Sequence, residues 1–365
     1  MKKIFTVLTS IALTFALSFS AAFANDDALM KSQNYLKTIT LDSPDAVIAY
    51  EATGMEADYK ADALLNNFKE TDYVTASYGD LAKSIIAISL LGENPKDFNN
   101  TNLVEILENR VQEDGTLTND VNGGCGATIW TLMALETVNS PKVKAVADKL
   151  STMAMDNGAY WYEYQGQNAD LDTTGWAMEA LSVAGRSTYK AAISKAYTFV
   201  QSKLNSTDGY YDNWGGNADT QSCVLEGLSV AGYTLDTNAY NYLLSYQNED
   251  GTFNALNYST GQLEPNAYAS VEGARALGVI NNGSFVLKAR QDYTKTTTPV
   301  VTEPETPTKP STTTPAVKPE TTTTEPKKET VKVVNTGDNT NVMAYVVAAI
   351  AAVGVIVLVI KSKKK

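Results

Sequence analysis

Short apolar segments that end in a small residue recur along the chain from about residue 45 to residue 280. Their ends lie 46 or 47 residues apart, after a first interval of 38 residues. A spacing this regular is typical of a repeat architecture, in which each unit buries its apolar face against its neighbours. The six segments cover residues 45–54, 84–92, 128–139, 174–185, 219–232 and 270–278.

A second, amphipathic helical pattern occurs in the same units, for example at 102–111, 143–153, 189–204 and 237–246. The nearly apolar segments predict enclosed helices, and the amphipathic ones predict outer helices with charged outer faces. Six of each close into an all-α α6/α6 toroid, with residues 28–38 as the sixth outer helix. A linear solenoid is the alternative and would need polar capping repeats. Asp-Gly and Asn-Gly pairs, which favour turns with positive φ, begin at residues 114, 157, 208 and 250.

Both ends of the chain carry targeting features. Residues 1–24 have the basic start, the apolar run and the Ala-Phe-Ala ending of a secretory signal peptide. Residues 342–360 lack any charge and are long enough, at ~1.5 Å per residue, to cross a ~30 Å hydrocarbon core. A basic tail at 361–365 follows, so we expect a transmembrane helix with a cytoplasmic tail. A buried core helix is the alternative for 342–360.

A Thr/Pro-rich segment separates the repeats from the predicted membrane helix. Residues 294–330 hold seven of the eleven prolines and fifteen threonines, without apolar periodicity. This composition predicts an extended stalk over 294–332. The stalk is either a plain spacer or a carrier of O-glycans.

Residues 333–338, Val-Val-Asn-Thr-Gly-Asp, precede the apolar run and the lysine tail. This order resembles the cell-wall sorting signal of Gram-positive surface proteins, although two valines replace the Leu-Pro of its motif. The resemblance implies that a sortase cleaves between Thr336 and Gly337 and joins the chain to peptidoglycan. Simple tethering in the plasma membrane is the alternative, and both leave residues 25–293 on the cell surface.

The charge and composition of the chain exclude several functions. It has no histidine, which rules out Ser-His-Asp and Cys-His nucleophile systems and His-ligated zinc. Residues 25–293 contain 17 basic and 35 acidic residues, a net charge of −18 that repels nucleic acid and anionic lipid. Acid–base chemistry would therefore have to come mainly from carboxylates.

Gln247-Asn-Glu-Asp-Gly-Thr-Phe253 resembles the repeat motif of the squalene cyclase and protein prenyltransferase superfamily, and 112–115 is a shorter copy. Asp170-Leu-Asp-Thr-Thr-Gly-Trp176 resembles the proton-donor motif of class II terpene cyclases. The resemblance implies a terpenoid cyclase-like toroid over roughly 30–290. Thr173 replaces the central acid of that motif, and the prenyltransferase zinc ligands are absent. The match is closer to secreted prenyltransferase-like repeat domains, whose common role is to hold a ligand.

Five acidic residues of the enclosed helices fall in register from one repeat to the next. Glu179, Glu226 and Glu272 are 47 and 46 residues apart, and Asp172 and Asp219 each lie seven residues before a glutamate on the same helical face. Facing the lumen, they would form an acidic wall and, with Asp170, the candidates for acid–base catalysis, weak Ca²⁺ binding or cationic-ligand binding. The alternative is structural, and Asp172 and Asp219 are also suitable helix N-caps.

Aromatic residues follow the glycine turns and predict loops at one mouth of the ring, where rings among Asn and Asp suit a glycan or peptide ligand. Plugging of the toroid end is the alternative for these aromatics, and Trp130 and Trp176 are predicted core residues. The predicted ligand-binding residues are Tyr160, Trp161, Tyr162, Asp172, Tyr210, Tyr211, Trp214, Asp219 and Gln221.

A whole repeat lies between Cys125 and Cys223, which predicts two free, buried thiols, with a single disulfide as the alternative. Gly-Gly-Cys-Gly at 123–126 resembles half of the complement thioester motif, but the required glutamine is Thr128. We expect a surface-anchored protein that binds an extracellular glycan, peptide or small molecule without a cofactor. The rival is a carboxylate-dependent polysaccharide hydrolase or lyase, followed by a cyclase-like enzyme.

Overall fold

The computed structural model divides the chain into two units, 1–301 and 302–365, and describes residues 26–297 of the first. Gaps in this description fall at 57–65, 67, 69–70, 121–123, 164 and 212–215. The predicted signal peptide, sorting motif and membrane segment lie outside it. Twelve helices and three two-stranded hairpins make up the described part, which confirms a helix-rich fold with only small sheets. Within that part, no helix is long and apolar enough to cross a membrane.

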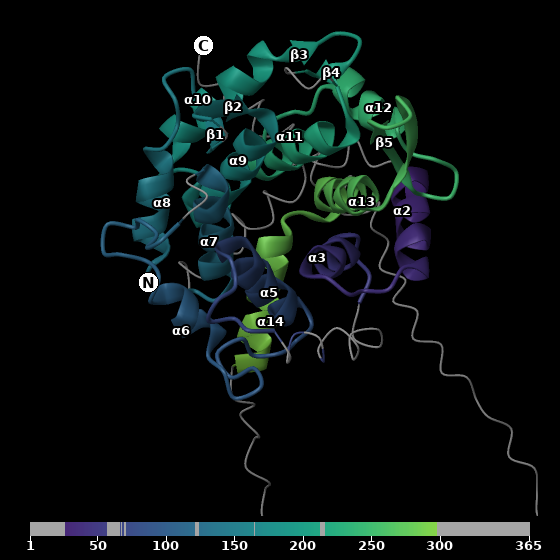
Figure 1. The fold of residues 1–365 in the computed structure, drawn as a ribbon. Coiled ribbons are helices and arrows are strands. Elements are labelled where there is room, and N and C mark those ends of the chain that lie inside the picture. Colours follow the sequence, from purple (N-terminus) through teal and green to yellow (C-terminus); the bar gives the residue numbers. More distant parts are fainter. Residues whose placement is uncertain are drawn as a thin grey trace, which may run out of the picture. The chain divides into compact units, whose positions relative to one another are not determined.

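Six of the helices pack in a closed ring (Figure 1). Each contacts the next in sequence order, and the last returns to the first. They coincide with the six apolar segments, and nearly all their side chains are buried because neighbours cover them on several sides. The ring consists of α3 (Pro44–Ala52), α5 (Tyr78–Leu90), α7 (Cys125–Thr137), α9 (Leu171–Gly185), α11 (Ala218–Ala231) and α13 (Ala267–Asn282).

Amphipathic helices pack against the ring from outside. They are α2 (Asp26–Thr38), α6 (Leu103–Glu108), α8 (Val143–Ser151), α10 (Lys190–Ser202) and α12 (Thr237–Ser245). The Asp-Gly and Asn-Gly turns have positive φ as predicted, and Gly115 and Gly158 lie against the backbones of α8 and α10. Gly251 lies against Lys31 of α2 in the same way, so α2 takes the position of an outer helix, and the described residues contain five of the six outer helices predicted.

The first and last repeats are joined through α2. Gln247, which begins the repeat motif named above, donates from Nε2 to the Ala28 carbonyl and to Ser32 Oγ, each at 2.9 Å. Lys31 Nζ also lies 3.1 Å from Glu249 Oε2. An N-terminal helix thus packs beside a repeat more than 200 residues later, as the sealing role of 28–38 requires.

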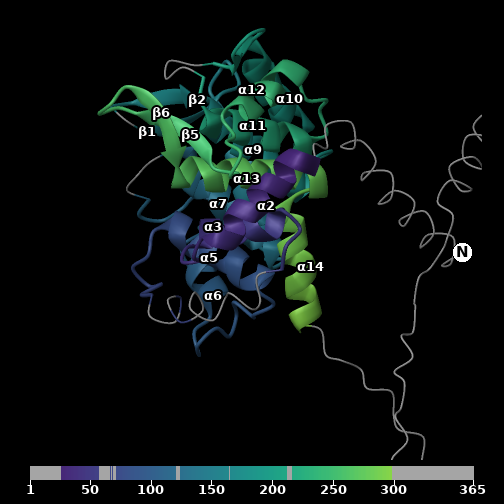
Figure 2. The same ribbon diagram turned by 90° about the vertical axis from the view of Figure 1, so that its right-hand side faces the viewer.

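Each of the last three ring helices is preceded by a hairpin. Tyr160–Glu163 (β1) pairs with Gln167–Asp170 (β2), Leu204–Asn205 (β3) with Gly209–Tyr210 (β4), and Phe253–Asn257 (β5) with Gln262–Asn266 (β6), all antiparallel. The hairpins β1–β2 and β5–β6 lie on the same side of the ring (Figure 2). The aromatic segments that begin at Tyr160 and Tyr210 were predicted to be loops. In the structure, both begin with strand residues that pair with the other strand of a hairpin.

Helices α9 and α11 approach each other most closely where glycines remove the side chains. A Cβ atom on Gly227 would lie 2.1 Å from the Gly175 carbonyl oxygen, and one on Gly175 would lie 2.3 Å from that of Cys223. No larger residue fits at either position without moving a backbone. This contact brings the carboxylates of the two helices to the same level.

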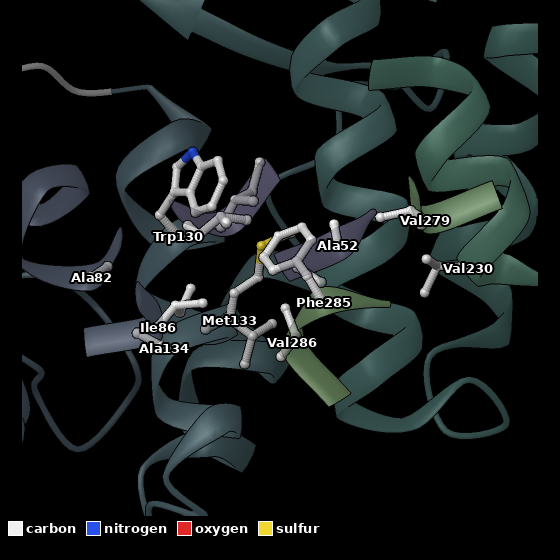
Figure 3. Close-up of a cluster of buried hydrophobic side chains, with 14 of the residues drawn as sticks. Ala52, Ala82, Ile86, Trp130, Met133, Ala134, Val230, Val279, Phe285 and Val286 are labelled. Carbon is white, nitrogen blue, oxygen red and sulfur yellow. The ribbon is translucent and has the colours of Figure 1, made fainter. Parts of the chain in front are cut away.

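The last described helix, α14 (Phe285–Thr297), closes the end of the ring opposite the hairpins (Figure 2). It packs against α3, α5 and α7. Phe285 stacks on Trp130 at a centroid distance of 6.3 Å and lies beside Met133 and Val286 (Figure 3). The helix was not among those predicted. It also continues through 294–297, the first four residues of the predicted stalk.

Candidate functional site

Two of the three glutamates predicted to lie in register, Glu226 and Glu272, share Arg275 as a partner. Arg275 of α13 donates from Nε to both oxygens of Glu226, at 3.2 and 3.0 Å. Its Nη2 lies 3.7 Å from Glu272 Oε1. Glu179 accepts a hydrogen bond from Ser284 at 3.0 Å. Arg275 therefore partly neutralises the predicted acidic wall, because it pairs with both Glu226 and Glu272. Glu179, Glu226, Glu272 and Arg275 are each at most 3% exposed.

Burial sets the protonation of these carboxyl groups. It raises the pKa of Glu272 to about 7, since Arg275 offsets only part of the cost of burying the charge. Burial and the neighbouring Glu226 also raise the pKa of Glu179 well above its usual range. Asp219 has a pKa raised by burial too. Carboxyl groups of raised pKa can act as general acids, but Glu179 and Glu272 are enclosed.

The alternative prediction that Asp172 and Asp219 are N-caps is wrong, because other residues cap their helices. Asp170 is the N-cap of α9 and accepts from Thr173 N at 2.8 Å and from Thr173 Oγ1 at 2.5 Å. The cap of α11 is Asn217. Asp172 and Asp219 lie in the first helical turns and are not N-caps, because the capping residue precedes each by two positions. Both side chains remain partly exposed.

The other half of the ring interior is internally paired, a feature that the sequence reasoning missed. Lys83 of α5 lies 2.9 Å from Asp45 Oδ1 of α3 and 4.6 Å above the centroid of Trp130. Trp130 also meets Trp176 edge-on at 5.8 Å. Trp130 is buried as predicted, whereas Trp176 keeps partial exposure. No spacing pattern marks Lys83, because its partners belong to other repeats.

Three of the predicted ligand-binding residues have structural roles. Tyr160 and Tyr210 are fully buried. The Tyr160 amide donates to Thr174 Oγ1 at 2.9 Å, and Gln221 bonds both the amide and the carbonyl of Tyr210, at 2.8 and 2.7 Å. The assignment of these tyrosines and Gln221 to ligand binding is therefore corrected, because each hairpin inserts its first aromatic residue into the core.

The remaining aromatics differ in exposure. Trp161 is half-buried, with its indole N–H donating to the Met153 carbonyl at 3.0 Å. Tyr211 is 48% exposed, and Tyr162 lines a cleft. Trp214 lies outside the described residues. Tyr162 thus best satisfies the prediction of an aromatic at the hairpin side of the ring.

This cleft, of about 600 Å³, lies at the N-terminal ends of α5 and α7. Residues 74–79, 118–120 and the start of α7 form its walls, with Arg110, Tyr162 and Glu163. The Arg110 guanidinium donates to the carbonyls of Tyr73, Val74 and Ala76 at 2.7–2.8 Å. These bonds fix the loop before α5, so the cleft is preformed.

A smaller hollow of about 230 Å³ lies beside α14 at the other end of the ring. Lys288 Nζ in its wall is 2.6 Å from Glu51 Oε2 and 3.0 Å from Asp292 Oδ2. Arg290 of α14 likewise pairs with Glu136 of α7. The charges here already neutralise one another and attach α14, which favours the larger cleft as a ligand site.

Within the described ranges, no cluster of three or more cysteine, aspartate or glutamate residues has an arrangement that could hold a metal ion. The weak Ca²⁺ prediction therefore has no ligand set there. Cys125 and Cys223 are both free and buried, as predicted. Burial raises the pKa of the Cys125 thiol to about 11, which makes it a poor nucleophile at neutral pH.

No protein-family model and no curated protein matches this chain. Nine chains of solved structures do match. One is a protein from Actinoplanes, known from a crystal structure, with 12% sequence identity and a TM-score of 0.45. The match covers 76% of this chain and 99% of that one.

Proposed function

We propose that this protein binds an extracellular glycan, peptide or small molecule, without covalent chemistry, in the cleft between α5, α7 and β1. The cleft of about 600 Å³ is the observation that carries the proposal. It combines an aromatic ring, polar groups and a rigid wall, the usual composition of a small-ligand site.

The same proposal includes the wider organisation of the chain. The ring and its outer helices would form an α6/α6 toroid similar to those of the squalene cyclase and prenyltransferase superfamily. Residues 1–24 would direct secretion, and 333–365 would anchor the toroid to the wall or membrane of a Gram-positive bacterium through a stalk. The apolar run, the lysine tail and the Thr-Gly pair support this location.

The structure favours binding over catalysis. Glu179 and Glu272, two of the carboxyl groups with raised pKa values, are at most 3% exposed, whereas a hydrolase needs its acid and base to reach a bound substrate. The cleft itself contains Asp120 and Glu163, which can accept hydrogen bonds from a ligand.

A binding screen on the full chain in detergent micelles tests the proposal. Glycans, peptidoglycan fragments and peptides are assayed by thermal shift with wild type, Tyr162→Ala and a control, Tyr258→Ala, whose ring is 84% exposed on another hairpin. We expect a ligand whose binding is lost only with Tyr162→Ala and which is recovered intact. Consumption of the ligand would instead support the hydrolase, and binding that survives Tyr162→Ala would reject the cleft.

A further inference from the structure

The charged groups around the cleft at α5 and α7 are mainly acidic. Arg110, Asp120 and Glu163 line it, so its wall carries one positive and two negative side chains. The N-terminal ends of α5 and α7 lie at the same cleft, and each acts as about half a positive charge. Asp80, in the first turn of α5, adds a third carboxylate beside them. Together these groups leave about one negative charge at the cleft.

The arginine of the cleft is already bonded to the backbone. Arg110 donates to three carbonyls of the loop before α5, at 2.7–2.8 Å, which occupies three of its five N–H groups. Its guanidinium also lies 5.6 Å from the centroid of the Tyr78 ring. An anionic ligand would have to compete with the carbonyls for this arginine, and the carboxylates of the wall would repel it.

The carboxylates of the wall can accept further hydrogen bonds. Glu163, the last residue of β1, is exposed, and its Oε1 accepts from the Gly166 amide at 3.0 Å. This bond orients the carboxylate, which has about four acceptor positions in all. Asp120 is half-buried. An ammonium group brings three donors and a positive charge, so it suits this wall better than a neutral or anionic group does.

Apolar side chains line the same cleft. Val74 is 71% exposed, and Ala76 and Ala127 are half-buried. Tyr162 adds an aromatic residue, and aromatic rings also attract ammonium groups. Lysine side chains lay their methylene groups on apolar surface and keep the charged end in polar surroundings. The cleft offers both kinds of surface, whereas an amino sugar has no alkyl chain to use the apolar part.

We infer that the cleft binds a peptide through a lysine-type side chain, whose ammonium group pairs with Glu163 and Asp120. The methylene groups of that side chain lie on the apolar wall formed by Val74, Ala76 and Ala127. The net charge of −18 on residues 25–293 attracts such a cationic peptide from a distance. This inference rests on the proposed function, because it names the ligand class of the same cleft.

Titration of the full chain in non-ionic detergent micelles, followed by heat, tests the inference. The probes are a blocked alanine pentapeptide with a central lysine, the same peptide with Nε-acetyl-lysine, the same peptide with glutamate, and glucosamine. We expect the lysine peptide to bind and its acetylated form to bind about tenfold or more weakly, because acetylation removes the charge. Added salt should weaken binding of the lysine peptide.

Variants of the wall locate the ammonium group. Glu163→Gln and Asp120→Asn should each weaken the lysine peptide by about two- to fivefold, the usual effect of a partly exposed ion pair. Glu93→Gln is the matched control, because it removes an exposed carboxylate beyond the opposite end of α5, and it should change nothing. Tyr162→Ala should abolish binding. Circular dichroism of each variant separates loss of the site from loss of the fold.

Equal binding of the lysine peptide and its acetylated form would overturn the inference, as would tighter binding of the glutamate peptide or of glucosamine. If such a probe is lost with Tyr162→Ala, the cleft remains a binding site and only the ligand class is wrong. Lysine-peptide binding that survives Tyr162→Ala would reject both proposals. Absence of binding by all four probes to a folded wild type would reject the lysine-type ligand, while the wider screen still tests the cleft.

Discussion

Arg275 of α13 donates from Nε to both carboxylate oxygens of Glu226 of α11, and each side chain is 1% exposed. The same guanidinium lies 3.7 Å from Glu272. One arginine thus supplies positive charge to two buried glutamates that the repeat had placed in register. Desolvation of such groups is costly, so the pair matters most when one partner is removed.

Arg275→Met should therefore destabilise the fold by about 3–5 kcal/mol, because it leaves Glu226 buried without its counter-charge. Urea denaturation at pH 7 measures the change. The double variant Glu226→Gln with Arg275→Met should recover part of the loss, since the buried charge is then gone too. A double variant as unstable as the sum of the single variants would contradict this account.

The raised pKa of Glu272 predicts a dependence of stability on pH. Burial raises it to about 7 from 4.5, so the folded chain binds more protons than the unfolded chain between these values. This stabilising contribution is complete below pH 4.5 and is lost as the pH rises to about 7, by up to about 3 kcal/mol. Urea denaturation from pH 4.5 to 7.5 should show this decline.

Glu272→Gln is the matched control for this pH dependence, because the amide keeps the shape and cannot ionise. The decline between pH 4.5 and 7 should become shallower in the variant. Glu179, whose pKa is also raised, should leave a residual slope. An unchanged slope in Glu272→Gln would show that other groups cause the decline.

Two glycine substitutions should have opposite effects on stability. Gly227→Ala places a Cβ atom 2.1 Å from the Gly175 carbonyl oxygen and should destabilise the fold by roughly 1–3 kcal/mol. Gly126→Ala, in the first turn of α7, meets nothing within 4 Å and should be neutral or stabilising by up to about 1 kcal/mol. Thermal and urea denaturation of both variants distinguish a close helix contact from a general cost of losing glycine.

Phe285→Ala tests whether α14 is an integral part of the core. The side chain is 1% exposed and stacks on Trp130, so its loss should cost about 3–5 kcal/mol in urea denaturation. The control Leu256→Ala removes a side chain that is 46% exposed and should change stability by less than about 0.5 kcal/mol. An equally small loss of stability in both variants would mean that α14 contributes little to the stability of the fold.

The sequence predicted much of the helical framework, because its period records how one structural unit repeats. The six apolar segments became the ring helices, the Asp-Gly turns have positive φ, and residues 28–38 form an outer helix. The register of Glu179, Glu226 and Glu272 also followed from spacing alone. These features depend on local geometry, which is the same in every unit.

Contacts between units could not be predicted in the same way. Spacing gives the level of a residue on its helix but not the side chain opposite it, so the pairs Glu226–Arg275 and Asp45–Lys83 emerged only in three dimensions. The sequence predicted Tyr160 and Tyr210 to be surface aromatics, but the hairpins place both side chains in the core.

By itself, then, the sequence determined the repeat, the helix types and the carboxylate positions, because these follow from periodicity and turn chemistry along one chain. Only the tertiary structure decided that α14 closes one end of the ring, that a cleft opens at α5 and α7, and which interior charges are neutralised. These depend on distances between segments remote in sequence, and such distances are fixed by packing rather than by local pattern.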